Sequence, residues 1–304
     1  MRPNYLDLKV DFMFKQLFGQ PSRKHITIAF LNDLLGRKDH SRIKDIQFIN
    51  TELSKETIDG KTVRLDLAVR TANGEKINVE IKVINQHYLP ERILYYWAKT
   101  YSSSIHSSEQ YHQLRPTISI AILNFTPFPN ETDDFHTIFH IREKSKHFLW
   151  SNQLEFHAFD LTSFVVQWRK YRRHLKQKNE LPWLLMLSAV DYPENELDDE
   201  LMSELEEWAM NIEQVREALI EWETISANKE NRVIYEARAK ELRDLLSNLE
   251  GERRLGREEG KELGRKEEKY QNAIKMIKKG LDFSLIEEIT GLSQEEILNL
   301  KEKE

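Results

Sequence analysis

The chain has 304 residues, of which 39% are hydrophobic and 32% are charged, and its formal net charge is −6 at pH 7. Because it contains no cysteine, a disulfide framework, a thiolate-bound zinc or iron–sulfur site and a cysteine nucleophile are excluded. No apolar run reaches the roughly 18 residues of a membrane span, and the opening residues lack the apolar stretch of a signal peptide. A cytoplasmic protein without membrane contact is therefore expected. The negative net charge leaves nucleic-acid binding to local basic patches.

The first 36 residues carry the pattern of two helices. Apolar residues recur about one helical turn apart in residues 8–18, and Gly19 and Pro21 interrupt this pattern. A second helix is expected from Ser22 to Leu35, where Gly36 ends it. The pattern predicts a pair of helices before the first strand.

Short strands follow these helices. Residues 43–53, 62–71 and 75–84 are rich in β-branched residues that alternate with polar ones, and Asp59-Gly60 and Asn73-Gly74 are turn signals between them. They predict an antiparallel meander.

The next segment adds a helix and further strands. Residues 91–114 have helical spacing of aromatic side chains, and residues 117–125 form an apolar run typical of a buried central strand. Residues 135–143 and 154–161 predict additional strands. We therefore expect an α/β core over residues 1–165.

Strand signals disappear after this core. Residues 166–250 predict an accessory helical region, and residues 251–269 form a charged segment in which glycine recurs every four or five residues. That segment is read as a solvated helix or a fluctuating coil. Residues 270–304 predict a small unit of three helices, with helix ends at Gly280 and Gly291 and capping boxes at Ser284 to Glu287 and Ser293 to Glu296.

The pairing register of residues 62–71 with 75–84 can be deduced from their apolar faces. A two-residue turn at Asn73-Gly74 would place apolar side chains on the charged face, which sheets avoid. A three-residue loop, with Gly74 in the left-handed conformation, instead pairs Leu67 with Val79. The same register places Asp66 directly opposite Glu80, with Lys82 on the face of Glu80.

Two facing carboxylates repel each other unless a positive charge lies between them. Oxygen ligands without thiolates favour Mg²⁺ or Mn²⁺, which would polarise a phosphoryl oxygen and lower the pKa of a bound water. Lys82 could then orient the attacking water or help to deprotonate it. The set of Asp66, Glu80 and Lys82 therefore predicts hydrolysis of a phosphodiester bond.

These residues resemble a known family. Asp66, followed by Glu80-Ile81-Lys82 on the next strand, resembles the core motif of the PD-(D/E)xK nuclease superfamily. The segments 11–19, 30–36, 79–83, 91–105, 114–125 and 278–298 are similar to those of the Rpn recombination-promoting nucleases, also described as transposases. Many members of that family have glutamine where Lys82 stands, and Leu65 replaces the proline that often precedes the first carboxylate.

The resemblance implies an α/β fold: a restriction-endonuclease-like core, in which helices flank a mixed sheet, followed by an all-helical C-terminal region. It implies a metal-dependent DNA endonuclease in which Asp66, Glu80 and the backbone carbonyl of Ile81 bind the metal and Lys82 lies at the water. Asp11 matches the acidic position of the family motif Asp-x-x-Phe-Lys on the first helix, and the resemblance implies a metal contact for it as well.

Simpler interpretations stand beside these. Asp66, Glu80 and Lys82 could lie on the solvated outer face of a sheet, and Asp11 could form an ordinary ion pair with Lys15 one turn away. The densest basic stretch predicts a phosphate-binding surface, although acidic residues 194–207 could balance it. Its basic residues are Arg169, Lys170, Arg172 and Arg173.

The sequence therefore predicts a metal-dependent endodeoxyribonuclease that acts on DNA in recombination or mobile-element biology. The alternative is a catalytically inactive, nuclease-derived protein that acts in oligomerisation or partner binding through its helical C-terminal half. DNA is the expected partner, and the C-terminal helices could form a homo-oligomer. The acidic residues of the last helices favour a protein-binding or packing role over DNA reading for the terminal unit.

Overall fold

The computed structural model describes residues 3–53, 63–85, 88–105, 110–191 and 194–302. Its centre is a sheet of six strands in the order β1-β4-β5-β6-β8-β7. The strands are β1 (Ile46–Phe48), β4 (Leu67–Thr71), β5 (Lys76–Lys82), β6 (Thr117–Leu123), β7 (His136–Phe139) and β8 (Leu154–Asp160). A separate pair consists of β2 (Glu52–Leu53) and β3 (Val63–Arg64).

The sheet is mixed. Strands β1, β4 and β5 form the predicted antiparallel meander, whereas β6 runs parallel to both β5 and β8, and β7 returns antiparallel to β8. A parallel pair needs a crossover connection, and α3 (Leu89–Ser102) supplies it between β5 and β6. The buried central strand predicted within residues 117–125 is confirmed as β6, which ends at Leu123 and in which every residue is buried. The Asp59-Gly60 turn lies outside the described residues.

The remaining regular structure of the described residues is helical. The predicted first pair is confirmed, but the second helix begins at Lys24, after a short 3₁₀ turn over Pro21–Arg23. The other helices are α1 (Asp11–Phe18), α2 (Lys24–Leu34), α4 (Leu161–Leu175), α5 (Leu181–Ser188), α6 (Asp199–Asn211), α7 (Glu213–Ala227), α8 (Lys229–Lys278), α9 (Phe283–Thr290) and α10 (Gln294–Glu302).

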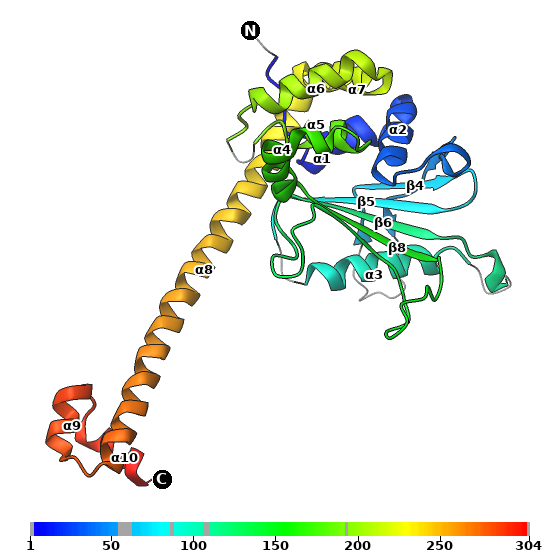
Figure 1. Cartoon of the computed structure of the whole chain (residues 1–304). Helices are drawn as coiled ribbons and strands as arrows, with labels where there is room; N and C mark the ends of the chain where they lie inside the picture. The colour runs from blue at the N-terminus through cyan, green and yellow to red at the C-terminus, as the bar shows by residue number, and fades with distance from the viewer. Residues whose placement is uncertain (1–2, 54–62, 86–87, 106–109, 192–193, 303–304) are drawn as a thin grey trace. The chain divides into compact units, whose positions relative to one another are not determined.

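Helical layers cover the sheet on both sides. Figure 1 shows α3 along one face and α1, α2, α4 and α5 on the opposite side. The rings of Phe18, Phe30 and Trp183 pack together there and join α1, α2 and α5. The indole of Trp222 on α7 donates to the carbonyl of Leu6, which ties the segment before α1 to the helical layer. These contacts fix α1 beside the sheet.

The charged face of β5 is covered by α3. Lys76, Asn78 and Glu80 are all buried, and the Lys76 ammonium donates to the Thr100 carbonyl and the Ser103 hydroxyl of α3. Burial lowers the pKa of Lys76 to about 8. The interpretation of this face as a solvated outer surface is therefore wrong, because α3 excludes water from it.

The loop between β4 and β5 sets their register. Gly74 has a φ of +85°, and Leu67 pairs with Val79 and Val69 with Ile77, as the three-residue loop predicts. The pairing ends at Leu67, however, and Asp66 occupies a bend between β3 and β4. The predicted direct Asp66–Glu80 strand pair is wrong, because the Asp66 carboxylate itself accepts the Ile81 N–H at 3.0 Å.

The chain divides into two compact units, residues 1–240 and 241–304. In the second unit the glycine-rich charged segment is part of the continuous helix α8, and Ile286 of α9 and Ile297 of α10 pack with Ala273 in a small core. Gly280 and Gly291 have positive φ angles, as expected for helix ends.

One of the two predicted capping boxes of this unit is present. The Ser293 hydroxyl accepts from the Glu296 N–H, and the Glu296 carboxylate accepts from the Ser293 N–H. The box predicted at Ser284 is wrong, because α9 begins at Phe283 and the Ser284 hydroxyl donates to Asp282. The four-part division of the chain at residues 165, 250 and 269 stays a prediction.

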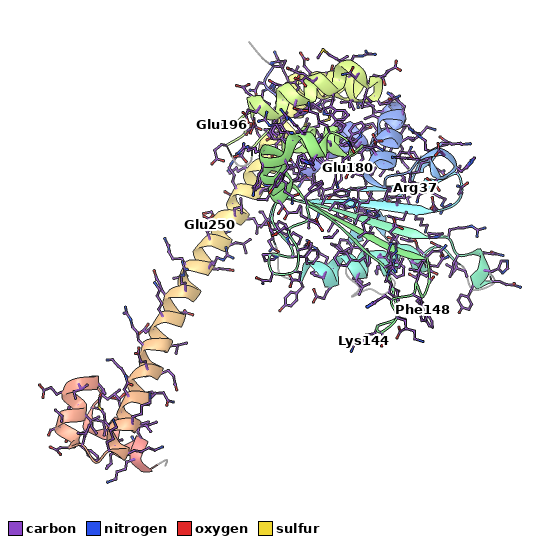
Figure 2. The ribbon with its side chains drawn as sticks, viewed as in Figure 1. Arg37, Lys144, Phe148, Glu180, Glu196 and Glu250 are labelled. Atoms are coloured by element: carbon purple, nitrogen blue, oxygen red, sulfur yellow. The ribbon has the colours of Figure 1, made fainter. Side chains whose placement is uncertain are left out.

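The strand β7 continues into a projecting loop before β8. Its outer part carries Lys144 and Phe148 (Figure 2), and Arg142 and Leu149 form an isolated bridge at its base. The side chains of Phe148 and Trp150 are largely exposed. This loop starts at the end of β7 that lies away from the carboxyl end of β5.

Gly74 provides a test of how the register is held. In Gly74→Ala, a Cβ would lie 3.1 Å from the Arg115 side chain in a backbone conformation that L residues avoid, so we expect a loss of about 1–2 kcal/mol in the free energy of unfolding. Gly74→Asn is the matched control and should lose less, because asparagine tolerates left-handed φ angles. Urea unfolding measures both; an alanine variant as stable as the wild type would contradict this account.

Candidate active site

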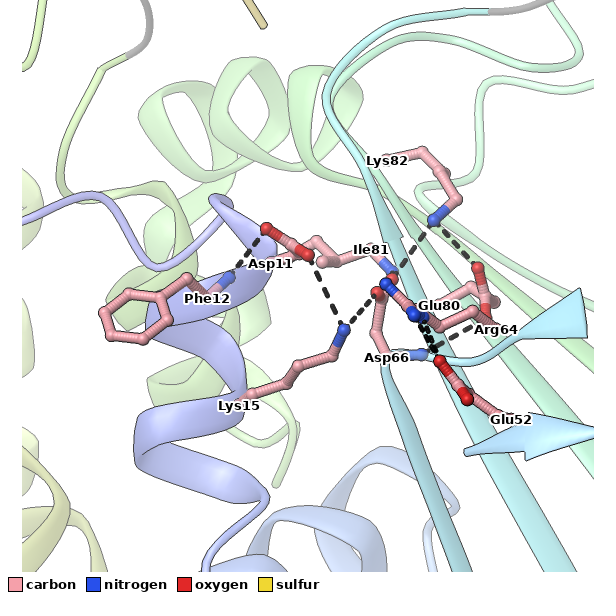
Figure 3. A network of polar contacts seen from close by, with 9 residues as sticks. All are labelled: Asp11, Phe12, Lys15, Glu52, Arg64, Asp66, Glu80, Ile81 and Lys82. Carbon is pink, nitrogen blue, oxygen red and sulfur yellow. Dashed lines mark hydrogen bonds and ion pairs between the residues drawn. The ribbon is translucent and has the colours of Figure 1, made fainter. Parts of the chain in front are cut away.

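The candidate site lies where β5 ends and β4 begins. Glu80 and Lys82 lie at the carboxyl end of β5, and Asp66 occupies the bend just before β4. Helix α1 approaches Asp66 from the side, as Figure 3 shows. Because Asp66 lies in a bend and not in a strand, its carboxylate can accept a hydrogen bond from the backbone N–H of Ile81 on β5.

Asp66 receives three contacts. Its Oδ2 accepts from the Ile81 N–H at 3.0 Å and lies 3.1 Å from the Lys82 Nζ, and its Oδ1 lies 3.3 Å from the Lys15 Nζ. The side chain is buried. Two ammonium groups and a backbone donor therefore stabilise its negative charge.

Glu80 is buried and has less support. Its Oε1 accepts from the Asp66 N–H at 3.3 Å, and its Oε2 lies 2.8 Å from the Lys82 Nζ. Burial, followed by the repulsion of the Asp66 carboxylate, raises the pKa of Glu80 to about 7. Near neutral pH this carboxyl group therefore exists in both protonation states.

Lys82 bridges the two carboxylates. Burial alone would lower its pKa, but the charges of Asp66 and Glu80 outweigh burial and raise it. The Lys82 side chain as a whole is 26% exposed. A protonated Lys82 acts as a hydrogen-bond donor and a source of positive charge.

Asp11 lies on the far side of Lys15 from this pair. Its Oδ2 is 3.5 Å from the Lys15 Nζ, which is the ordinary i, i+4 ion pair considered from the sequence, and its Oδ1 accepts from the Phe12 N–H. Lys15 thus connects Asp11 to Asp66 (Figure 3). Sequence reasoning missed Lys15 as a site residue, although it is the lysine of the Asp-x-x-Phe-Lys motif.

The donor set fits a hard divalent cation. Mg²⁺ is commonly bound by one or two carboxylates together with waters and substrate phosphate, and Asp66 and Glu80 supply two oxygen ligands. The Lys82 ammonium lies between the Asp66 and Glu80 carboxylates, where a positive charge reduces the repulsion between them. Within the described residues, no group of three or more His, Cys, Asp or Glu side chains gathers as a metal site.

The predicted basic surface lies on α4 and faces acidic partners. Arg169 contacts Asp198 at 2.6 Å, and Arg172 contacts Glu200 at 2.9 Å and covers the ring of Trp168. The Lys170 ammonium lies over the Tyr171 ring, and Arg173 is exposed. The sequence suggested that acidic residues 194–207 balance these cations, and the structure shows such ion pairs for two of the four, Arg169 and Arg172.

The mixed sheet, with Asp66 before β4 and Glu80-Ile81-Lys82 at the end of β5, is the fold of a PD-(D/E)xK nuclease. A family model described as PD-(D/E)XK nuclease family transposase matches residues 8–252, so the chain belongs to that family. The match confirms the resemblance found from the sequence motifs. Comparisons with curated proteins and with solved structures give no significant match. In the part of the chain that the structure describes, no helix is long and apolar enough to cross a membrane.

The pKa of Glu80 predicts a pH dependence of stability. A carboxyl group whose pKa rises from 4.5 to about 7 on folding binds its proton more tightly in the folded chain. The free energy of unfolding should therefore decrease as the pH rises from 4.5 to 7 without metal, by up to about 3 kcal/mol from this group.

Glu80→Gln should remove this decrease, because glutamine does not titrate. Urea unfolding at pH 5 and at pH 8 in EDTA measures it. Glu131→Gln changes an exposed carboxylate and is the control, which should keep the wild-type pH profile. A Glu80→Gln variant with the wild-type pH profile would show that Glu80 does not carry the effect.

Proposed function

We propose that this protein is a divalent-metal-dependent endodeoxyribonuclease that hydrolyses phosphodiester bonds of DNA with a metal-activated water. The observation that carries the proposal is the Lys82 ammonium within 3.1 Å of Asp66 and 2.8 Å of Glu80 in a buried pair of carboxylates. Membership of a nuclease family supports it. A role in DNA recombination or mobile-element biology follows from the transposase description of that family.

Asp66, Glu80 and the Ile81 carbonyl would hold Mg²⁺ or Mn²⁺, with Asp11 as an additional metal contact across Lys15. When bound, the ion would supply Lewis acidity towards the phosphate and a lower pKa for a bound water. Lys82 would donate a hydrogen bond to the attacking water or to a phosphate oxygen, and its charge would stabilise the charge that develops there. Lys15 would hold the Asp66 carboxylate in place through the 3.3 Å contact.

DNA binding would involve the α4 surface. Arg169 and Arg172 would exchange Asp198 and Glu200 for phosphates, whereas Lys170 and Arg173 have no such acidic partner among the described ion pairs. Each phosphate contact would add counterion release to the affinity.

Substitutions in the carboxylate pair test the proposed function. Asp66→Asn and Glu80→Gln should each lower plasmid cleavage in Mg²⁺ or Mn²⁺ by at least about 100-fold, because each removes a charged metal ligand. Lys82→Gln should retain part of the activity, since glutamine still donates to water, whereas Lys82→Glu should be inactive. The assay is nicking of supercoiled plasmid with and without EDTA.

Two results would argue against the proposal. One is cleavage that persists in EDTA, and the other is full activity in both carboxylate variants. If the pure, folded protein cleaves nothing in either metal, the alternative of an inactive, nuclease-derived binding protein is favoured.

The homo-oligomer is proposed to form through the C-terminal helices. Leu255 and Leu263 on α8 are 57% and 68% exposed, and the glycines near them have open space around them. Deleting residues 251–304 should lower the number of chains per particle, measured by light scattering, and leave a folded remainder, because residues 1–240 form a compact unit. An unchanged number of chains together with lost DNA binding would instead make this segment a DNA reader.

A further inference from the structure

A cavity of about 460 Å³ lies on the face of the sheet that α3 covers. Its floor contains Ala121 and Ala158, which are register partners on β6 and β8. Leu89 and Ile93 of α3 pack beside them. Since neither alanine side chain extends beyond Cβ, space remains between the sheet and the helix.

Aromatic rings surround this cavity. The ring centroids of Phe128 and Phe139 are 5.3 Å apart, and Phe125 and Phe156 contribute further lining. Phe139 is 43% exposed at the rim. An open apolar cavity edged by exposed rings is the usual form of a ligand site.

The backbone at the cavity mouth is strained. Tyr88 lines the mouth directly before α3 and has a φ of +66°, which is rare for a residue other than glycine. Such strain is concentrated at ligand-binding and active sites.

The cavity adjoins the candidate active site. Ala121 pairs with Glu80, and Leu123 pairs with Lys82, in the parallel register of β5 and β6. Paired residues on neighbouring strands point to the same face and lie about 4.8 Å apart. A nucleotide whose phosphate contacts Lys82 would therefore have its base within reach of the cavity.

The chemistry of the lining favours a nucleobase as the occupant. Every base has a flat π-face that stacks on aromatic side chains, and Asn85 at the rim offers an amide donor and acceptor for a base edge. Lys82 is the register partner of Leu123, which lines the cavity, and its ammonium group suits a ligand that carries phosphates. A base inside an intact duplex is stacked and paired, so it could not enter.

We infer that this cavity binds one unpaired DNA base next to the phosphodiester bond at the Asp66 site, so that the substrate class is DNA with unpaired bases rather than fully paired duplex. This inference rests on the proposed function, because it names the substrate of the same site. The base enters between α3 and the Phe128–Phe139 wall, and stacking holds the adjoining phosphate at Lys82.

Binding of three DNA probes to the full-length protein tests the inference. The probes are a fully paired duplex, the same duplex with a short mismatched bubble, and that bubble with abasic residues in both strands. Fluorescence anisotropy in EDTA gives the affinities without cleavage, because EDTA removes the metal ion that cleavage is proposed to need. The mismatched bubble should bind about 10-fold more tightly than either other probe, as expected for one base stacked on aromatic side chains.

Two variants remove the cavity or its wall. Ala121→Leu fills the cavity and should abolish the preference for bases in the bubble, and Phe139→Ala removes an exposed wall and should weaken that preference even if Ala121→Leu does not fold. Ile138→Ala is the matched control: Ile138 is also exposed, at 51%, but points to the opposite face of β7, so the preference should stay.

Equal binding of the base-carrying and abasic bubbles by the wild type would overturn the inference. So would an unchanged preference in folded Ala121→Leu. Failure of the proposed function appears separately, as absence of cleavage of both the supercoiled plasmid and the mismatched bubble in Mg²⁺ or Mn²⁺, because the affinities are measured without metal.

Discussion

The arrangement of this protein depends on two carboxylates that share one buried place at the end of β5. The repulsion between the two carboxylates and the burial of Glu80 both oppose the ionisation of Glu80. Ammonium groups from two different elements offset this repulsion: Lys82 contacts Glu80, and Lys15 contacts Asp66. Lys82 comes from the same strand as Glu80, whereas Lys15 comes from α1. The Lys15 contact with Asp66 therefore forms only when the first helix is packed against the sheet.

This packing uses a large part of the first unit. The aromatic contacts of Phe18 with Phe30 and Trp183 hold α1 against α2 and α5, and Trp222 of α7 ties down the segment in front of α1. The accessory helices after the sheet therefore support the same helix that supplies Lys15. Burial of an ionisable glutamate costs stability, as is common where side chains are placed for chemistry rather than for packing.

Much of this could be predicted from local pattern. Alternating apolar residues gave the strands, and the need to keep Leu67 and Val79 on one face selected the three-residue loop, which Gly74 then adopts. That register also predicted that Asp66, Glu80 and Lys82 lie close together.

What could not be predicted depends on contacts distant in sequence. At Asp66 the side chain accepts a hydrogen bond from the Ile81 N–H in place of a backbone carbonyl, and the chain bends there. The alternation of apolar and polar residues does not reveal such a side-chain hydrogen bond. The Lys76 ammonium is bound by the carbonyl of Thr100 on α3, and the contact of Lys15 with Asp66 joins residues 51 positions apart. An i, i+4 spacing explained Lys15 equally well as a surface ion pair, so only the tertiary structure distinguished the two.

The raised pKa of Glu80 also links cation binding to proton release. A carboxyl group must lose its proton before it can bind a metal ion, and burial beside Asp66 makes Glu80 hold its proton more tightly than an exposed glutamate does. In the proposed enzyme, a cation and a proton would therefore compete for the oxygen atoms of Glu80, and acid would favour the proton.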